Sequence, residues 1–84
     1  MKIENLRKVE FGTVKAFFDV DFEKIKVKGF KLIQQNGQAM WCSAPDEKYT
    51  DKKTGKPAYK KIVEITDIQL AGKISAAAIE EYNK

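Results

Sequence analysis

The stretch Thr13–Phe22, which reads Thr-Val-Lys-Ala-Phe-Phe-Asp-Val-Asp-Phe, decides the fold class of this chain. Its apolar residues fall on one parity, namely Val14, Ala16, Phe18, Val20 and Phe22. The polar residues fall on the other parity, and Phe17 is the single exception. Alternation with a period of two over this length is typical of a β-strand with one buried face. We therefore predict a strand over Thr13–Phe22.

The segments that flank this strand extend the sheet. Apolar residues in Ile3–Val9 predict a strand before it, and a tight turn at Glu23-Lys24 leads into another over Lys24–Ile33. In that last segment the apolar parity changes at Gly29. One inserted residue at a glycine is typical of a β-bulge, so we predict a single bent strand with irregular pairing at Gly29.

Two further strands are predicted after Ile33, one from a turn signal and one from apolar residues. Asn36-Gly37 is a strong hairpin signal, because a type I′ turn requires positive φ at both central residues. The returning strand is predicted over Ala39–Ser43, and Pro45 should end it because proline has no N–H for the ladder. Apolar residues in Lys60–Ile65 predict the last strand.

The C-terminal segment has the pattern of a helix. Thr66 and Gln69 have the spacing of a capping box. Apolar residues then form one helical stripe, made of Leu70, Ile74, Ala77, Ala78 and Tyr82. We predict a helix near Asp67–Tyr82 that packs on the sheet through Leu70, Ile74 and Ala78. The expected fold is α+β, a bent antiparallel β-sheet meander with one C-terminal helix, in a single domain of residues 1–84.

Composition limits the classes of function. Apolar residues make up 43% of the 84 residues, which is enough for a folded core, and the formal charge of +4 favours anionic partners. Arg7 is the only arginine among 16 cationic residues. Lysine contacts phosphate as a point charge, whereas bidentate reading of guanine uses arginine. If nucleic acid binds, backbone contact is therefore favoured over direct reading of bases.

The residues of catalytic and metal chemistry are sparse. Histidine is absent, which removes the usual proton shuttle, and the sequence shows no converging set of acid, base and nucleophile; Cys42 is the single cysteine, so no internal disulfide can form. We predict no enzymatic activity, no metal, no organic cofactor and no small-molecule substrate. We also expect a cytoplasmic protein without a membrane partner, because the sequence shows no secretory signal and no apolar run of bilayer length.

The segment Asp46–Lys61 carries most of the candidate binding residues. We predict a lysine-rich loop that contacts nucleic acid through Lys48, Lys52, Lys53, Lys56, Tyr59, Lys60 and Lys61. The alternative is a solvated loop whose lysines serve only solubility. Tyr59 either stacks on a base or anchors the loop on the sheet.

Other residues have competing interpretations. The outward lysines of Lys24–Lys31 extend a basic surface or protect a sheet edge against aggregation. Trp41 is assigned to the core or to a dimer interface rather than to a base platform. Phe17 on the solvent face predicts a homodimer in which a second copy covers it.

The ordered residues resemble the stage V sporulation protein G family of bacteria, also called the septation-protein family. The match runs through the helix Gly72–Tyr82, the hairpin strand from Asn36-Gly37 to Pro45, and Gly55 followed by Tyr59-Lys60-Lys61-Ile62. The sequence departs from the family pattern where Asp46-Glu47 replaces two basic residues and Lys61 replaces an acidic one. The resemblance implies a small α+β homodimer that binds DNA or RNA and modulates gene expression or division.

Two classes of function therefore remain at the level of sequence. The first is a nucleic-acid-binding regulator that uses the lysine-rich segment. The second is a protein-interaction module in septation or regulation that does not bind nucleic acid. Salt separates them, because phosphate contacts weaken steeply as salt rises and an apolar protein interface does not.

Overall fold

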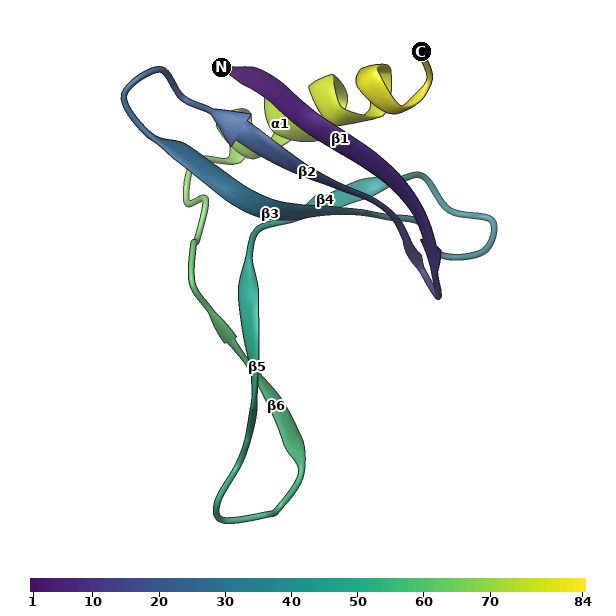
Figure 1. The fold of residues 1–84 in the computed structure, drawn as a ribbon. Coiled ribbons are helices and arrows are strands. Elements are labelled where there is room, and N and C mark those ends of the chain that lie inside the picture. Colours follow the sequence, from purple (N-terminus) through teal and green to yellow (C-terminus); the bar gives the residue numbers. More distant parts are fainter.

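The strands and the helix follow one another in a simple order along residues 1–84, all of which the computed structural model describes. The strands are β1 (Lys2–Phe11), β2 (Val14–Asp21), β3 (Lys26–Ile33), β4 (Trp41–Ser43), β5 (Asp46–Thr50) and β6 (Pro57–Lys61), and the helix α1 is Ile68–Tyr82. β1 to β4 form a four-stranded antiparallel sheet in chain order, and β5 and β6 form a separate two-stranded sheet (Figure 1). The predicted α+β class with one C-terminal helix is confirmed.

The core lies between one face of the large sheet and α1. Its seven residues are Ala16, Phe18, Val20, Phe30, Leu32, Ile74 and Ala78. The rings of Phe18 and Phe30 stack at 5.5 Å between centroids. The predicted inward parity of β2 and the contacts of Ile74 and Ala78 are confirmed, and Leu70 packs against the same cluster half-buried. With only nine of 84 residues buried, the core is small and each of its contacts matters for stability.

The predicted irregularity at Gly29 is confirmed. Phe18 pairs with Phe30 and Val20 with Val27, so β3 uses one residue more than β2 between these pairs. Gly29 takes up the insertion with φ +92°, a conformation that glycine adopts without steric cost.

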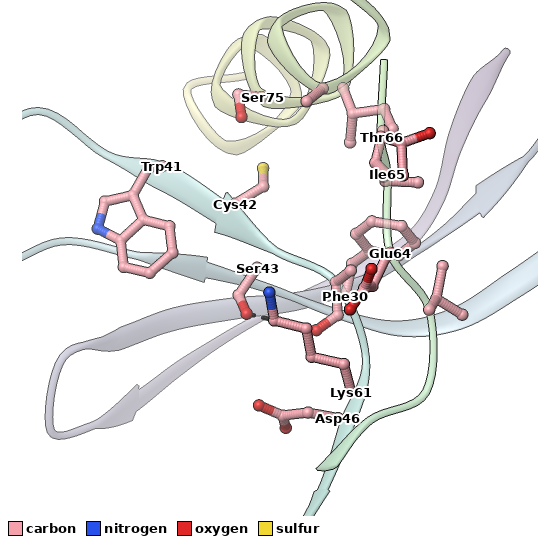
Figure 2. Close-up of a pocket in the computed structure, with 14 residues that line it drawn as sticks. Phe30, Trp41, Cys42, Ser43, Asp46, Lys61, Glu64, Ile65, Thr66 and Ser75 are labelled. Carbon is pink, nitrogen blue, oxygen red and sulfur yellow. Dashed lines mark hydrogen bonds between the residues drawn. The ribbon is translucent and has the colours of Figure 1, made fainter. Parts of the chain in front are cut away.

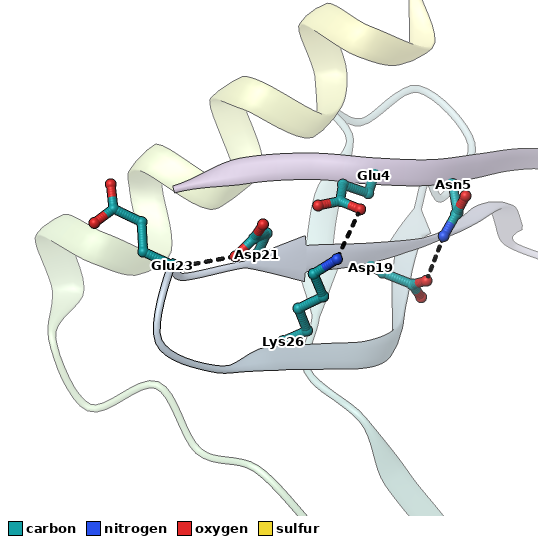
Figure 3. A network of polar contacts seen from close by, with 6 residues as sticks. All are labelled: Glu4, Asn5, Asp19, Asp21, Glu23 and Lys26. Atoms are coloured by element: carbon teal, nitrogen blue, oxygen red, sulfur yellow. Dashed lines mark hydrogen bonds and ion pairs between the residues drawn. The ribbon is translucent and has the colours of Figure 1, made fainter.

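Asp19 holds this bulge and a second one together, and Figure 3 shows its contact with Asn5 at the second. Its carboxylate is 7% exposed and accepts hydrogen bonds from the Gly29 N–H at 3.3 Å and the Asn5 Nδ2 at 3.1 Å. Asn5 lies where the pairing of β1 with β2 shifts register, and its φ is +53°. A buried carboxylate therefore ties irregular points of β1 and β3 to the strand between them.

The predicted turn at Asn36-Gly37 exists, but the predicted turn type is wrong. The Gln38 N–H donates to the Gln35 carbonyl at 3.0 Å, and Gly37 has φ +73° while Asn36 has no positive φ. One positive φ at the second central residue is typical of type II rather than type I′. The connection from Ile33 to Trp41 is longer than a two-residue hairpin, so it does not need the turn that matches strand twist.

Two sequence predictions near the helix are also wrong. The last strand is not Lys60–Ile65, because β6 ends at Lys61 and pairs with β5 rather than with the large sheet. The N–H groups of Ile62 and Val63 donate instead to the Pro45 carbonyl, at 3.1 and 3.4 Å. The helix begins at Ile68, one residue later than the predicted capping box of Thr66 and Gln69 requires.

Asp67 is the N-cap of α1. Its carboxylate accepts the N–H groups of Gln69 at 2.9 Å and Leu70 at 3.3 Å, which satisfies two of the free donors of the first turn. Thr66 lies outside this arrangement. No helix has the length and apolar character needed to cross a membrane.

Candidate nucleic-acid interface

The lysine-rich segment is a β-hairpin, so its description as a loop is wrong. β5 and β6 pair from Asp46 opposite Lys61 to Thr50 opposite Pro57. We call Asp46–Lys61 the arm. It projects away from the large sheet and from α1 (Figure 1), and five residues of strand give it a paired length of about 17 Å. Pro57 is compatible with pairing because it is the first residue of its strand.

The tip of the arm is an ordered turn over residues 51–56. The Asp51 N–H donates to the Lys56 carbonyl at 2.9 Å, and the Gly55 N–H donates to the Asp51 carbonyl at 2.7 Å. The Asp51 carboxylate also accepts the Lys53 N–H at 2.8 Å. These bonds hold the backbone of Lys52 and Lys53 in one arrangement at the far end of the arm.

The base of the arm is anchored to the body of the protein. Pro45 is buried, and its carbonyl accepts the two N–H groups that follow β6. The Asp46 carboxylate is 3.4 Å from the Nζ of Lys31, which lies on β3. An isolated two-stranded hairpin is marginal in water, so these contacts at the base help to hold the arm in place.

The two faces of the arm carry different residues. Side chains alternate between faces along each strand, and paired residues share a face. The register therefore defines a Lys48 face and a Tyr49 face. The Lys48 face contains Asp46, Lys48, Thr50, Pro57, Tyr59 and Lys61, and the Tyr49 face contains Glu47, Tyr49, Ala58 and Lys60.

All six lysines predicted to bind nucleic acid are exposed on the arm. Lys48, Lys60 and Lys61 lie on its strands, and Lys52, Lys53 and Lys56 lie at its tip. None of the six belongs to an ion pair, since the three ion pairs are Lys26–Glu4, Lys31–Asp46 and Lys84–Glu81. Their ammonium groups are therefore free for an anionic ligand.

The tyrosines of the arm are exposed as well. Tyr59 is 63% exposed and Tyr49 is 49% exposed. The hypothesis that Tyr59 anchors the segment on the sheet is wrong, because the ring lies on a hairpin away from the sheet.

The competing lysines of the segment Lys24–Lys31 are less free than those of the arm. Lys26 pairs with Glu4 at 3.5 Å (Figure 3), and Lys31 pairs with Asp46 at 3.4 Å. Lys24 and Lys28 are exposed and have no ion pair. The arm therefore carries the larger set of unpaired cations.

A groove of about 480 Å³ lies at the base of the arm, between β4, the segment 63–66 and α1 (Figure 2). Its lining combines apolar residues with Asp46 and Lys61 from the arm. Burial raises the pKa of the Cys42 thiol in this groove, and a hydrogen bond with Ser75 acts in the opposite direction. No group of three or more potential metal-ligating side chains is present. Sequence reasoning missed the groove because it arises where the chain leaves the β5–β6 ladder, and no local pattern marks that point.

Apolar side chains also form a row across the large sheet. Phe11 pairs with Val14, Val14 with Ile33, and Ile33 with Trp41, so the row joins all four strands. Phe11 is 75% exposed and Trp41 is 45% exposed. The core assignment of Trp41 is therefore wrong. Phe17, predicted on the solvent face, is half-buried and pairs with Arg7 and Lys31.

Comparison of the chain with protein-family models, with curated proteins and with solved structures gives no match. The fold and the site together describe a small α+β domain that carries a cationic hairpin arm.

Proposed function

We propose that this protein is a nucleic-acid-binding regulator that grips phosphates of DNA or RNA with its arm. The observation that carries the proposal is the arm itself, on which six lysines are exposed and free of ion pairs. Each lysine that neutralises a phosphate releases condensed counterions, which gives affinity without sequence reading. The single arginine of the chain, Arg7, lies on β1 and not on the arm.

The regulatory part of the proposal rests on the resemblance of the sequence to the septation-protein family. That resemblance favours a role in gene expression or cell division, in the cytoplasm, without enzymatic activity. Of the segments that carry the resemblance, Gly72–Tyr82 lies in α1, Trp41-Cys42 in β4 and Tyr59-Lys60-Lys61 in β6.

The arm is tested by changing Lys52, Lys53 and Lys56 together to alanine. Loss of three phosphate contacts should lower the slope of log affinity against log salt by roughly 2–3. Binding to unrelated sequences should weaken together, because phosphates carry no sequence information. The measurement is fluorescence anisotropy with labelled DNA and RNA of random sequence at several salt concentrations.

The matched control changes Lys24, Lys28 and Lys73 to alanine. These exposed lysines lie off the arm, and their loss lowers the formal charge of +4 by the same three units. The control should keep most of the affinity and the original slope. An arm variant with unchanged affinity and slope would contradict the proposal, and a loss confined to the control would move the site to the Lys24–Lys31 surface.

We further propose that the protein is a homodimer. Its surface is 6445 Å², whereas a compact monomer of 9.6 kDa exposes about 5,100 Å². The projecting arm accounts for part of this excess. The apolar row of Phe11, Val14, Ile33 and Trp41 is our candidate interface, with a second copy as its partner.

Sedimentation velocity over a range of concentrations tests the dimer. We expect a dimer mass that falls to monomer on dilution, and a Phe11→Ser, Trp41→Ser variant that stays monomeric. Glu10→Ser is a control on the same strand, outside the apolar row. A monomer mass at every concentration contradicts the homodimer. A monomer that captures a different protein through this row, without salt dependence, favours the interaction-module alternative.

A further inference from the structure

The two faces of the arm differ in a way that indicates which form of nucleic acid it binds. The inference depends on the proposed function, since it concerns the same arm. A duplex presents phosphates on its outside and keeps the faces of its bases stacked inside. A single strand presents phosphates together with the faces of its bases. An arm with lysines alone suits both forms, whereas an accessible aromatic ring beside the lysines favours the single strand.

Charge distinguishes the two faces. On the Tyr49 face, Lys60 lies directly opposite Glu47, so this face carries no net charge. On the Lys48 face the only acidic residue is Asp46, and its carboxylate pairs with Lys31 from outside the arm. Lys48 and Lys61 on this face are exposed and unpaired. The Lys48 face is therefore the more cationic one.

Tyr59 is a neighbour of both of these cations on the Lys48 face. Tyr59 pairs directly with Lys48 across the hairpin, and Lys61 follows two residues later on the same face. Paired side chains have Cβ atoms about 5 Å apart, and alternate residues of a strand are about 7 Å apart. Tyr59 is also the more exposed of the two arm tyrosines, at 63% against 49% for Tyr49. A base on this ring would have Lys48 directly across the hairpin and Lys61 one step further toward the base of the arm, where it also lines the groove.

We propose that the Lys48 face, with Tyr59 at its centre and Lys48 and Lys61 beside it, is a stacking platform for single-stranded nucleic acid. Tyr59 stacks on one base, and the two lysines contact the neighbouring phosphates. The tip lysines add phosphate contacts that serve a duplex as well as a single strand. The platform therefore gives a preference for single strands of either DNA or RNA.

The test compares Tyr59→Ala with Tyr49→Ala, its counterpart on the other face of the arm. Each variant is titrated at one fixed salt concentration against a labelled 20-nucleotide mixed-sequence strand and against the duplex of that strand, in DNA and RNA versions. Loss of one stacked base should weaken single-strand binding by about 5- to 150-fold. Tyr59→Ala should leave duplex binding within about 2-fold, and Tyr49→Ala should leave both within about 2-fold.

A conservative variant separates stacking from loss of structure. Tyr59→Phe keeps the aromatic face and should retain single-strand affinity, and circular dichroism should show all three variants folded. The platform is overturned if the two alanine variants have equal effects, or if Tyr59→Ala weakens single strand and duplex to the same extent. If the unchanged protein binds duplex and single strand equally and Tyr59→Ala alters neither, the platform fails while the arm still binds phosphates. If the unchanged protein binds neither form, the proposed function fails with it.

Discussion

Removal of the Asp19 carboxylate should destabilise this fold strongly. Asp19 is 7% exposed and accepts hydrogen bonds from the Gly29 N–H and from the Asn5 side chain. Hydrogen bonds to a charged group contribute about 1.5–3 kcal/mol each. Water replaces part of the bond to Asn5, which is exposed, but the N–H of half-buried Gly29 is left without its partner. We therefore expect Asp19→Ala to lower the free energy of unfolding by about 2–4 kcal/mol.

That loss is large for a domain of this size. At about 0.05–0.15 kcal/mol per residue, a chain of 84 residues has a total stability of roughly 4–13 kcal/mol. The melting temperature should fall by roughly 8–30 °C, from about 4–8 °C for each kcal/mol. Urea unfolding followed by circular dichroism measures the free energy, and a thermal scan measures the melting temperature.

Asp21→Ala is the matched control, since Asp21 lies two residues further along the same strand. Its carboxylate is not buried and accepts the exposed N–H of Glu23 at 2.7 Å, which water can replace, so we expect a clearly smaller loss than for Asp19→Ala. Asp19→Asn should fall between the two, because its carbonyl oxygen still accepts the Gly29 N–H. Equal losses in Asp19→Ala and Asp21→Ala, within about 0.5 kcal/mol, would refute the role of Asp19 as the tie between two bulges.

Two further predictions concern the helix and the cysteine. Gly72 is exposed in α1, has no positive φ and has open space where a Cβ would lie. Because alanine favours a helix over glycine, Gly72→Ala should stabilise the fold by about 0.8–1 kcal/mol in the same urea assay. An unchanged or lower urea midpoint would contradict this prediction. Burial raises the pKa of the Cys42 thiol. Because the thiolate is the reactive form, alkylation of Cys42 by iodoacetamide should reach half its maximal rate at a higher pH in the folded protein than in the urea-unfolded chain. Equal pH values for half-maximal rate in the two states would contradict this prediction. Because this pKa is higher in the folded state, the contribution of Cys42 to stability is fully present below about pH 8.5 and falls as pH rises through the folded pKa; Cys42→Ala should remove that dependence.

The parts of the fold that sequence predicted are those in which burial dictates the pattern. Phe18 and Val20 alternate with polar residues because one face of β2 packs under α1, and the register change at Gly29 follows from the same parity. The arm has no such pattern, because both of its faces are exposed. Its pairing comes from the backbone ladder and from the turn at its tip, which composition does not reveal.

The apolar residues after the arm misled the prediction for a related reason. Val63 and Ile65 alternate like a strand, but they line the groove beside α1 instead of pairing in the sheet. Period-two alternation reports which side chains face an apolar surface, and it does not report whether a neighbouring strand is available. The position of the lysines was therefore predictable, whereas the hairpin that presents them was not.

Because the arm lies outside the core, substitutions on the arm affect binding, whereas substitutions in the core affect folding. No residue of β5 or β6 belongs to the hydrophobic core, and the arm is joined to the body through Pro45 and the contact of Asp46 with Lys31. Substitutions at Lys52, Lys53 or Tyr59 therefore remove ligand contacts without creating a cavity in the core. Substitutions at Asp19 or Phe18 act on the support of the whole sheet. Binding and folding can thus be perturbed independently in this molecule, and a variant that loses both has its defect in the body or at the base of the arm rather than at the tip.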